Sequence, residues 1–104
     1  MTSTYKVSYT PEAEEDLRQI VENLLGTTWP RSVEKWLNKI LNKADSLATF
    51  PEGNSIYEYD NRFRSVKVGK YRIIYEVHKK AKVVSILRII YARRNLKEIT
   101  IKNK

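Results

Sequence analysis

The chain has 104 residues, of which 41% are hydrophobic and 11% aromatic, enough for a single hydrophobic core, and its formal net charge is +8. It contains no cysteine and only one histidine, His78, which excludes disulfides, a thiol nucleophile and a metal site with several histidine ligands. The N-terminus has no signal-peptide pattern and no apolar run approaches the roughly 20 residues that span a bilayer, so we expect a one-domain cytoplasmic protein without a membrane partner.

The chain begins with the pattern of a strand followed by a helix. Apolar and polar residues alternate over positions 5–9, as in a half-buried strand. Thr10 and Pro11 then form an N-cap and first-turn pair, and the acidic residues within positions 12–16 suit the dipole of a helix start. Apolar residues recur every three or four positions from there to Gly26, which is expected to end the helix.

A second helix is expected to begin at Pro30 and to end at the break formed by Phe50 and Pro51. Its apolar stripe matches that of the first helix, and Trp29 and Trp36 are most simply core residues of this pair. Because the connection between the two helices is short, they should form an antiparallel helical hairpin.

The second half of the chain changes to the two-residue period of strands. Strands are expected over 63–68, 71–78 and 83–91, and 56–59 is either a short strand or an extended loop. Short turns make the last strands antiparallel neighbours. The sequence therefore predicts an α+β fold of order β-α-α-β-β-β, with the helical hairpin on one face of a small, mainly antiparallel twisted sheet. Residues 95–104 are expected to form a short C-terminal tail.

Positive charge is concentrated in this second half, where residues 51–104 hold fourteen Lys and Arg against five Asp and Glu. The candidate binding residues are Arg64, Lys67, Lys70, Arg72, Arg88, Arg93 and Arg94. Such a face is typical of binding to phosphate or to an acidic partner. The alternative is that these cations pair with nearby acids and only solubilise the sheet, but five acids cannot neutralise fourteen bases.

Strand alternation places Arg72 on one face with Ile74, and Arg88 on one face with Val84, Ile86 and Ile90. Arginines in strand interiors are costly when buried against helices, so we expect them on the open side of the sheet. Both faces are largely apolar, and the pattern alone does not say which one is open.

The segments Val68-Gly-Lys-Tyr-Arg-Ile-Ile-Tyr-Glu-Val and Ile86-Leu-Arg-Ile-Ile-Tyr-Ala-Arg-Arg-Asn resemble the C-terminal half of the RelE/ParE superfamily. These proteins are toxins of type II toxin–antitoxin modules. The opening strand, the Thr-Pro-Glu-Ala helix start and the long second helix are similar as well, so the resemblance covers about residues 5–95. It implies a single toxin domain over residues 1–104 that arrests growth, needs no cofactor or metal and is neutralised by a cognate acidic antitoxin.

The superfamily has two activities. RelE-like members are ribosome-dependent endoribonucleases that cut mRNA. In that case Arg72 would grip the phosphate, Arg93 would support the leaving oxygen, and Lys67 with Arg64 would lie near the family's basic pair. The stacking tyrosine that such nucleases often carry after the last arginine is missing here, and Tyr91 is the possible substitute.

ParE-like members inhibit DNA gyrase and are not enzymes. Tyr91-Ala-Arg-Arg-Asn resembles their closing motif. The missing stacking tyrosine also favours DNA gyrase as the target over the ribosome with its mRNA. A nucleic-acid-binding module without toxicity would share the net charge and the aromatic-rich sheet, so this third hypothesis about the function stays open.

Overall fold

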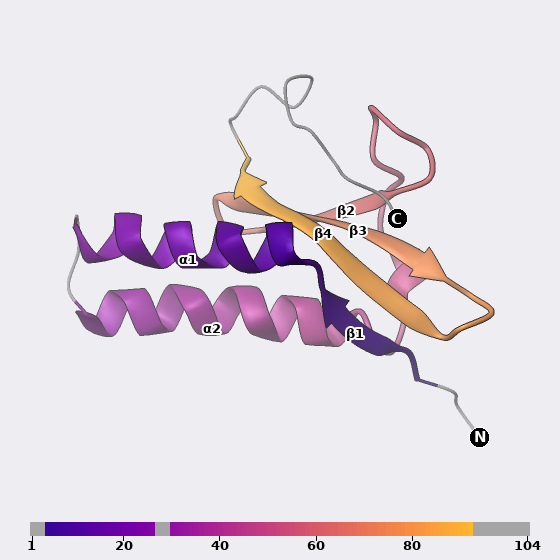
Figure 1. Ribbon diagram of the computed structural model, residues 1–104, viewed down its shortest axis with the longest axis horizontal. Coiled ribbons are helices and arrows are strands. Elements are labelled where there is room, and N and C mark those ends of the chain that lie inside the picture. Colours follow the sequence, from indigo (N-terminus) through magenta and orange to yellow (C-terminus); the bar gives the residue numbers. More distant parts are fainter. Residues whose placement is uncertain (1–3, 27–29, 93–104) are drawn as a thin grey trace.

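The computed structural model describes residues 4–26 and 30–92 of the chain (Figure 1). The elements are β1 (Lys6–Tyr9), α1 (Pro11–Leu25), α2 (Pro30–Ser46), a 3₁₀ helix (Pro51–Gly53), β2 (Arg64–Val68), β3 (Tyr71–His78) and β4 (Val83–Tyr91). The predicted α+β order is therefore confirmed. The segment 56–59 is loop, joined to the sheet by an isolated bridge between Ile56 and Arg64. No helix among the described residues is long and apolar enough to cross a bilayer.

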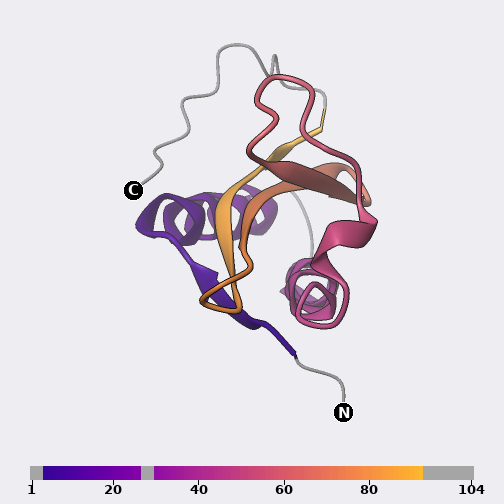
Figure 2. The ribbon, with the colours of Figure 1, turned by 90° about the vertical axis from the view of Figure 1, so that its right-hand side faces the viewer.

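The four strands form one sheet in the order β1-β4-β3-β2. β4 pairs antiparallel with β3, and β3 pairs antiparallel with β2, which confirms the mainly antiparallel sheet. β1 is the exception, because it runs parallel to β4 from the register of Lys6 with Val83 to that of Tyr9 with Ile86. The view along the helices shows how strongly this sheet is twisted (Figure 2).

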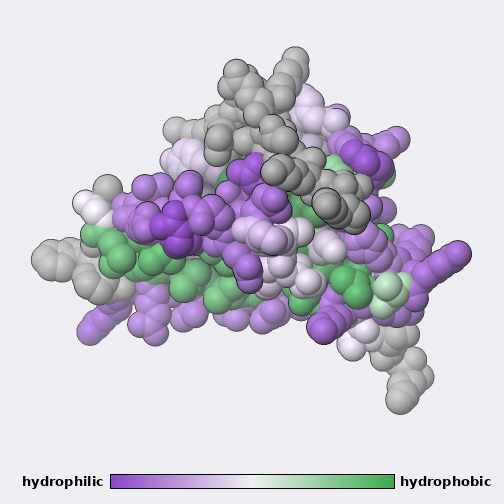
Figure 3. Space-filling model, in the orientation of Figure 1, coloured by the Kyte–Doolittle hydropathy of each residue, from purple (hydrophilic) through white to green (hydrophobic). Residues whose placement is uncertain are grey.

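Both helices pack against one face of the sheet. Their buried side chains and those of this sheet face form one core cluster: Ala13, Ile20, Leu24, Val33, Ile40, Ala44, Leu47, Val68, Tyr71, Ile73, Tyr75, Val84, Ile86 and Ile89. Outside the core, a band of hydrophobic residues remains visible between the hydrophilic outer rows of α1 and α2 (Figure 3). The helical hairpin is thus amphipathic in the way that its sequence period requires.

The opposite face of the sheet carries a second, smaller core. It consists of Tyr57, Phe63, Ile74, Leu87 and Ile90. The first two belong to the loop between the 3₁₀ helix and β2, so this loop covers part of the face that has no helix. That face is therefore open only in part.

A β-bulge corrects one prediction about the faces of β4. Ile74 pairs with Arg88, but the next residue, Tyr75, pairs with Ile86, so Leu87 is an extra residue in β4. Arg88 therefore does not share a face with Val84 and Ile86, which both lie in the helix-side core. Simple alternation fails here because the extra residue reverses it between Ile86 and Arg88.

Thr10 explains why α1 begins where the sequence predicts. Its hydroxyl oxygen accepts a hydrogen bond from Ala13 N at 3.1 Å, as an N-cap does. The same hydroxyl lies 3.0 Å from the carbonyl oxygen of Ile86, and the Thr10 amide donates to that carbonyl at 3.0 Å. One residue thus caps α1 and fixes it to the bulged part of β4.

Tyr75→Phe is expected to lower the free energy of unfolding by about 1–3 kcal/mol, the cost of leaving a buried acceptor unsatisfied. The Tyr75 side chain is fully buried, and its hydroxyl donates to the carbonyl oxygen of Pro51 at 2.6 Å. Denaturant unfolding measures the loss. Tyr59→Phe is the control, because Tyr59 is 48% exposed. Equal stability of the two variants would contradict the prediction.

Candidate functional site

Arg72 lies in the middle of the sheet, on the face opposite the helices. Its Nε donates to the Ser65 hydroxyl at 3.1 Å, and its two terminal nitrogens donate to the two carboxylate oxygens of Glu58. The guanidinium carbon lies 5.6 Å from the centre of the Tyr57 ring. The side chain is only 17% exposed, so its position is closely fixed by these partners.

Lys67 is the direct partner of Arg72 across β2 and β3, and its side chain is exposed. Both cations line an open hollow of about 530 Å³. Its walls are Gly53, Asn54, Ser55, Glu58, Ser65, Val66, Lys67 and Arg72. The hydrogen bond from Arg72 is the main reason why the pKa of Glu58 is lowered. Two of the predicted site residues are therefore brought together, beside one carboxylate.

Arg64 and Arg88 do not line the hollow with Arg72 and Lys67. Each of them binds another part of the protein instead. Arg64 pairs with Tyr75 in the strand register, and its guanidinium donates to the backbone carbonyl of Asn54 at 2.7 Å. It thereby fixes the start of the loop that covers the sheet.

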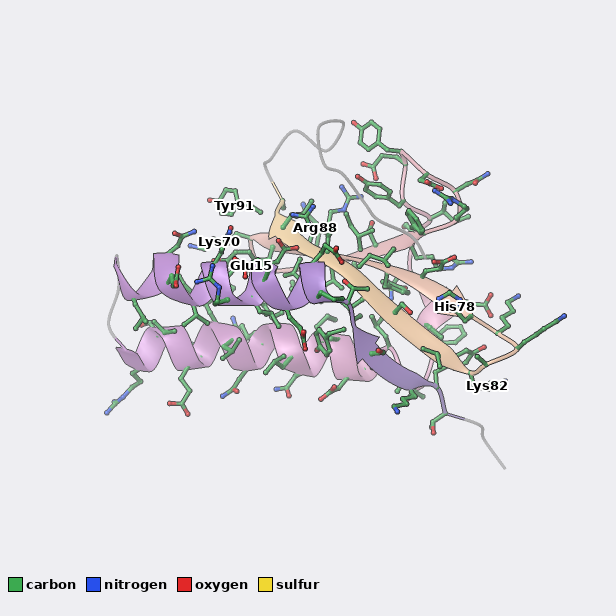
Figure 4. The ribbon with its side chains drawn as sticks, viewed as in Figure 1. Glu15, Lys70, His78, Lys82, Arg88 and Tyr91 are labelled. Atoms are coloured by element: carbon green, nitrogen blue, oxygen red, sulfur yellow. The ribbon has the colours of Figure 1, made fainter. Side chains whose placement is uncertain are left out.

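Arg88 forms an ion pair with Asp16 of α1, with 2.7 Å between Nε and Oδ2. A second hydrogen bond joins Arg88 Nη2 to Oδ1 at 3.0 Å, and the amide of Ile89 donates to Oδ2 at 3.0 Å. The side chains are 16% and 11% exposed, and the hydrogen bond with Asp16 raises the pKa of Arg88. Figure 4 shows Arg88 beside the first half of α1. The pair joins the helical hairpin to β4.

Lys70 and Tyr91 lie together at one end of the sheet, on the helix side. Figure 4 shows both above α1, with His78 and Lys82 at the other end. Tyr91 pairs with Tyr71 in the strand register, and their rings meet edge to face at 6.0 Å. The Tyr71 ring in turn meets the Trp36 ring edge to face, with 5.9 Å between the ring centres. Lys70 Nζ lies 5.5 Å from the centre of the Trp36 ring.

Strand register thus separates the predicted residues into two groups. Because neighbouring residues of a strand point to opposite faces, Tyr71 and its partner Tyr91 lie on one side of the sheet, and Arg72 and Lys67 on the other. Arg93 and Arg94 lie outside the described residues, as do Trp29 and the tail 95–104. Within 4–26 and 30–92, no group of His, Cys, Asp or Glu side chains could hold a metal ion.

The family model for the ParE toxin of type II toxin–antitoxin systems (parDE) matches residues 7–96. The chain belongs to this toxin family. None of the curated proteins matches its sequence. The match thus runs from within β1 to the residues just after β4.

Solved structures of toxins of both branches share the fold. The chromosomal ParDE toxin–antitoxin system from P. aeruginosa contains a chain that superposes with a TM-score of 0.77 at 18% identity, covering 86% of this toxin and 98% of that chain. The RelBE2 toxin–antitoxin complex from Mycobacterium tuberculosis gives a TM-score of 0.63 at 21% identity, covering 88% and 94%. The isolated RelE toxin of E. coli gives 0.58 at 18% identity, covering 89% of each chain.

Sequence reasoning missed two acidic residues that matter in this geometry. Asp16 was one of several acids at a helix start, and only its contact with Arg88 distinguishes it. Glu58 was one of the nearby acids in the alternative in which the cations only solubilise the sheet, but nothing in the pattern assigned it to Arg72. The arginine partners of Asp16 and Glu58 lie in other elements, far from them in the sequence. No short-range signal could therefore have identified either pair.

Proposed function

We propose that this toxin arrests growth by inhibiting DNA gyrase, that Arg72 and Lys67 contact its target, and that an acidic antitoxin neutralises it. The observation that carries the choice of target is the division of the candidate residues between two faces. A nuclease needs its phosphate-binding cations and its base-stacking aromatic around the same nucleotide. Tyr91 lies on the helix side of the sheet with Tyr71, away from Arg72 and Lys67.

The position of Arg88 also supports the gyrase proposal. Arg88 is engaged by Asp16, so this cation serves the join between α1 and β4. The surface that remains offers the fixed guanidinium of Arg72, the exposed Lys67 and one carboxylate, a set of charges suited to binding a charged partner. The match to the ParE toxin family agrees with this choice.

The antitoxin proposal rests on charge and on the relatives. Residues 51–104 hold nine more basic than acidic residues, which favours an acidic partner. The relatives from P. aeruginosa and Mycobacterium tuberculosis are a toxin–antitoxin system and a toxin–antitoxin complex. Co-expression with the neighbouring gene and affinity capture test this, and recovery of the toxin alone beside a soluble neighbour would count against it.

Ribosome-dependent mRNA cleavage is the second candidate, favoured by the direct pairing of Arg72 with Lys67 in one hollow. Such a pair could stabilise the charge on a phosphate during cleavage. This candidate predicts that translation stops first and that mRNA is cut within codons only when ribosomes are present. A toxin of either kind arrests growth on expression, which a nucleic-acid-binding module without toxicity does not.

Purified toxin is expected to inhibit supercoiling by gyrase, and Arg72→Ala or Lys67→Ala to weaken this inhibition about tenfold or more. The reason is that a hydrogen bond to a charged group contributes about 1.5–3 kcal/mol. Lys80→Ala is the matched control for Lys67→Ala, because Lys80 is also an exposed lysine but lies in the turn between β3 and β4. Undisturbed supercoiling together with ribosome-dependent mRNA cleavage that Arg72→Ala abolishes would establish the second candidate instead.

A further inference from the structure

Arg72 is held in one orientation before any ligand arrives. Ser65, which is 6% exposed, fixes Nε from the neighbouring strand, and the ring of Tyr57, which is 2% exposed, lies against the guanidinium. These partners leave the two terminal nitrogens directed toward Glu58 in the hollow. A guanidinium fork fixed in this way is suited to bind an oxyanion through two parallel hydrogen bonds.

Glu58 occupies this fork, but it does so from an exposed position. Each of its carboxylate oxygens contacts one terminal nitrogen of Arg72, while the side chain remains 52% exposed. Glu58 belongs to the covering loop, next to the anchored Tyr57, so its carboxylate stays close to Arg72 whenever the loop is in place. Ion pairs with an exposed partner are weak, so a stronger anion can displace this one.

Lys67 indicates which anion fits. It lies directly across from Arg72, on the same face and in the same hollow. Both oxygens of the Glu58 carboxylate are used by Arg72. A phosphate group has a further oxygen for the Lys67 ammonium, and it also accepts hydrogen bonds from hydroxyls such as those of Ser55 and Ser65, which line the hollow.

We propose that Glu58 is an internal competitor that occupies a phosphate-binding site formed by Arg72 and Lys67, and that it must leave the fork before a phosphate can bind. The phosphate is one carried by nucleic acid in the target complex, since both gyrase and the ribosome act with a nucleic acid. Only this last assignment rests on the proposed function; the competition itself follows from the contacts of Glu58. The toxin thus supplies from its own chain a carboxylate that binds Arg72, one of the two cations proposed to contact its target.

The competition can be measured on the free toxin with inorganic phosphate as the probe, by titration followed through amide shifts in NMR spectra. Glu58→Gln removes the competing charge and keeps the size of the side chain, and it is expected to tighten phosphate binding about two- to fivefold. Glu52→Gln is the matched control, because Glu52 forms an ion pair of 3.0 Å with Lys79 and does not line the hollow. This control removes the same charge and should leave the affinity unchanged. Arg72→Ala should abolish binding at the hollow.

The outcomes separate the two claims. Tighter binding in Glu58→Gln alone supports the internal competitor, whereas equal gains in Glu58→Gln and Glu52→Gln would show a general charge effect and overturn it. Phosphate that binds Arg72→Ala as well as the wild type would overturn the site itself. If Glu58→Gln tightens phosphate binding but wild-type toxin leaves growth and gyrase undisturbed, the competition stands and the proposed function fails.

Discussion

Asp16→Ala is expected to cost about 3–5 kcal/mol of unfolding free energy, because it leaves the Arg88 charge nearly buried and without its carboxylate partner. It also removes the acceptor of the Ile89 amide. Small domains are stable by about 5–15 kcal/mol in total, so this one change should remove a large share. Chemical denaturation followed by circular dichroism measures it.

Glu15→Ala is the control from the neighbouring position. Glu15 forms an ion pair with Arg18 on the exposed surface of α1, where solvent screens the charges, so losing it should change the free energy of unfolding only slightly. Adding Arg88→Met to Asp16→Ala should recover much of the loss, because it removes the largely buried charge that has lost its Asp16 carboxylate. A cost for Asp16→Ala no larger than that for Glu15→Ala would show that the pair does not hold α1 to the sheet.

Gly69→Ala is expected to destabilise the toxin by about 2–5 kcal/mol. Gly69 has a φ of +59°, in the left-handed region that costs other residues roughly 1–2 kcal/mol. An added Cβ would also lie 2.3 Å from Cζ3 of the Trp36 ring, and such overpacking typically costs about 1–3 kcal/mol. Thermal and chemical unfolding of the variant measure the total.

A double-mutant cycle with Trp36→Leu separates the two causes. In the Trp36→Leu background the ring is absent, so Gly69→Ala should cost only the backbone contribution of about 1–2 kcal/mol. The same cost in both backgrounds would contradict a contact between the added methyl and the ring. Gly26→Ala is a suitable control, because Gly26 has a φ of −79° and an added Cβ there would come no closer than 3.6 Å to another atom.

Local sequence signals were sufficient for most elements of the fold. Thr10 followed by Pro11 gave the start of α1, Pro30 gave that of α2, and the periodic runs over 71–78 and 83–91 coincide with β3 and β4. Gly26 follows the last residue of α1, although its φ of −79° means that it does not end the helix through the left-handed conformation. These features depend on residues within one or two turns of each other, which is the range over which propensity and capping act.

Features set by long-range pairing were not predictable. The parallel pairing of β1 with β4 and the bulge at Leu87 have no local signature, and the bulge made the face assignment of Arg88 wrong with respect to Val84 and Ile86. For the candidate site, the sequence supplied the cations but not their grouping. Only the register of β2, β3 and β4 puts Arg72 with Lys67 and places Tyr91 on the other face.

The parallel pairing of β1 with β4 also has a consequence for synthesis on the ribosome. β1 pairs with β4, the last strand of the sheet in chain order, so β1 cannot pair until β4 has emerged. Until then the apolar stripes of α1 and α2 lack much of the sheet that they cover in the finished domain, because β3 and β4 supply most of its buried side chains. A chain released before Tyr91 therefore lacks the strand that joins the two ends of the fold. Synthesis of β4 is thus the step that allows the helical hairpin and the four-stranded sheet to assemble as one domain.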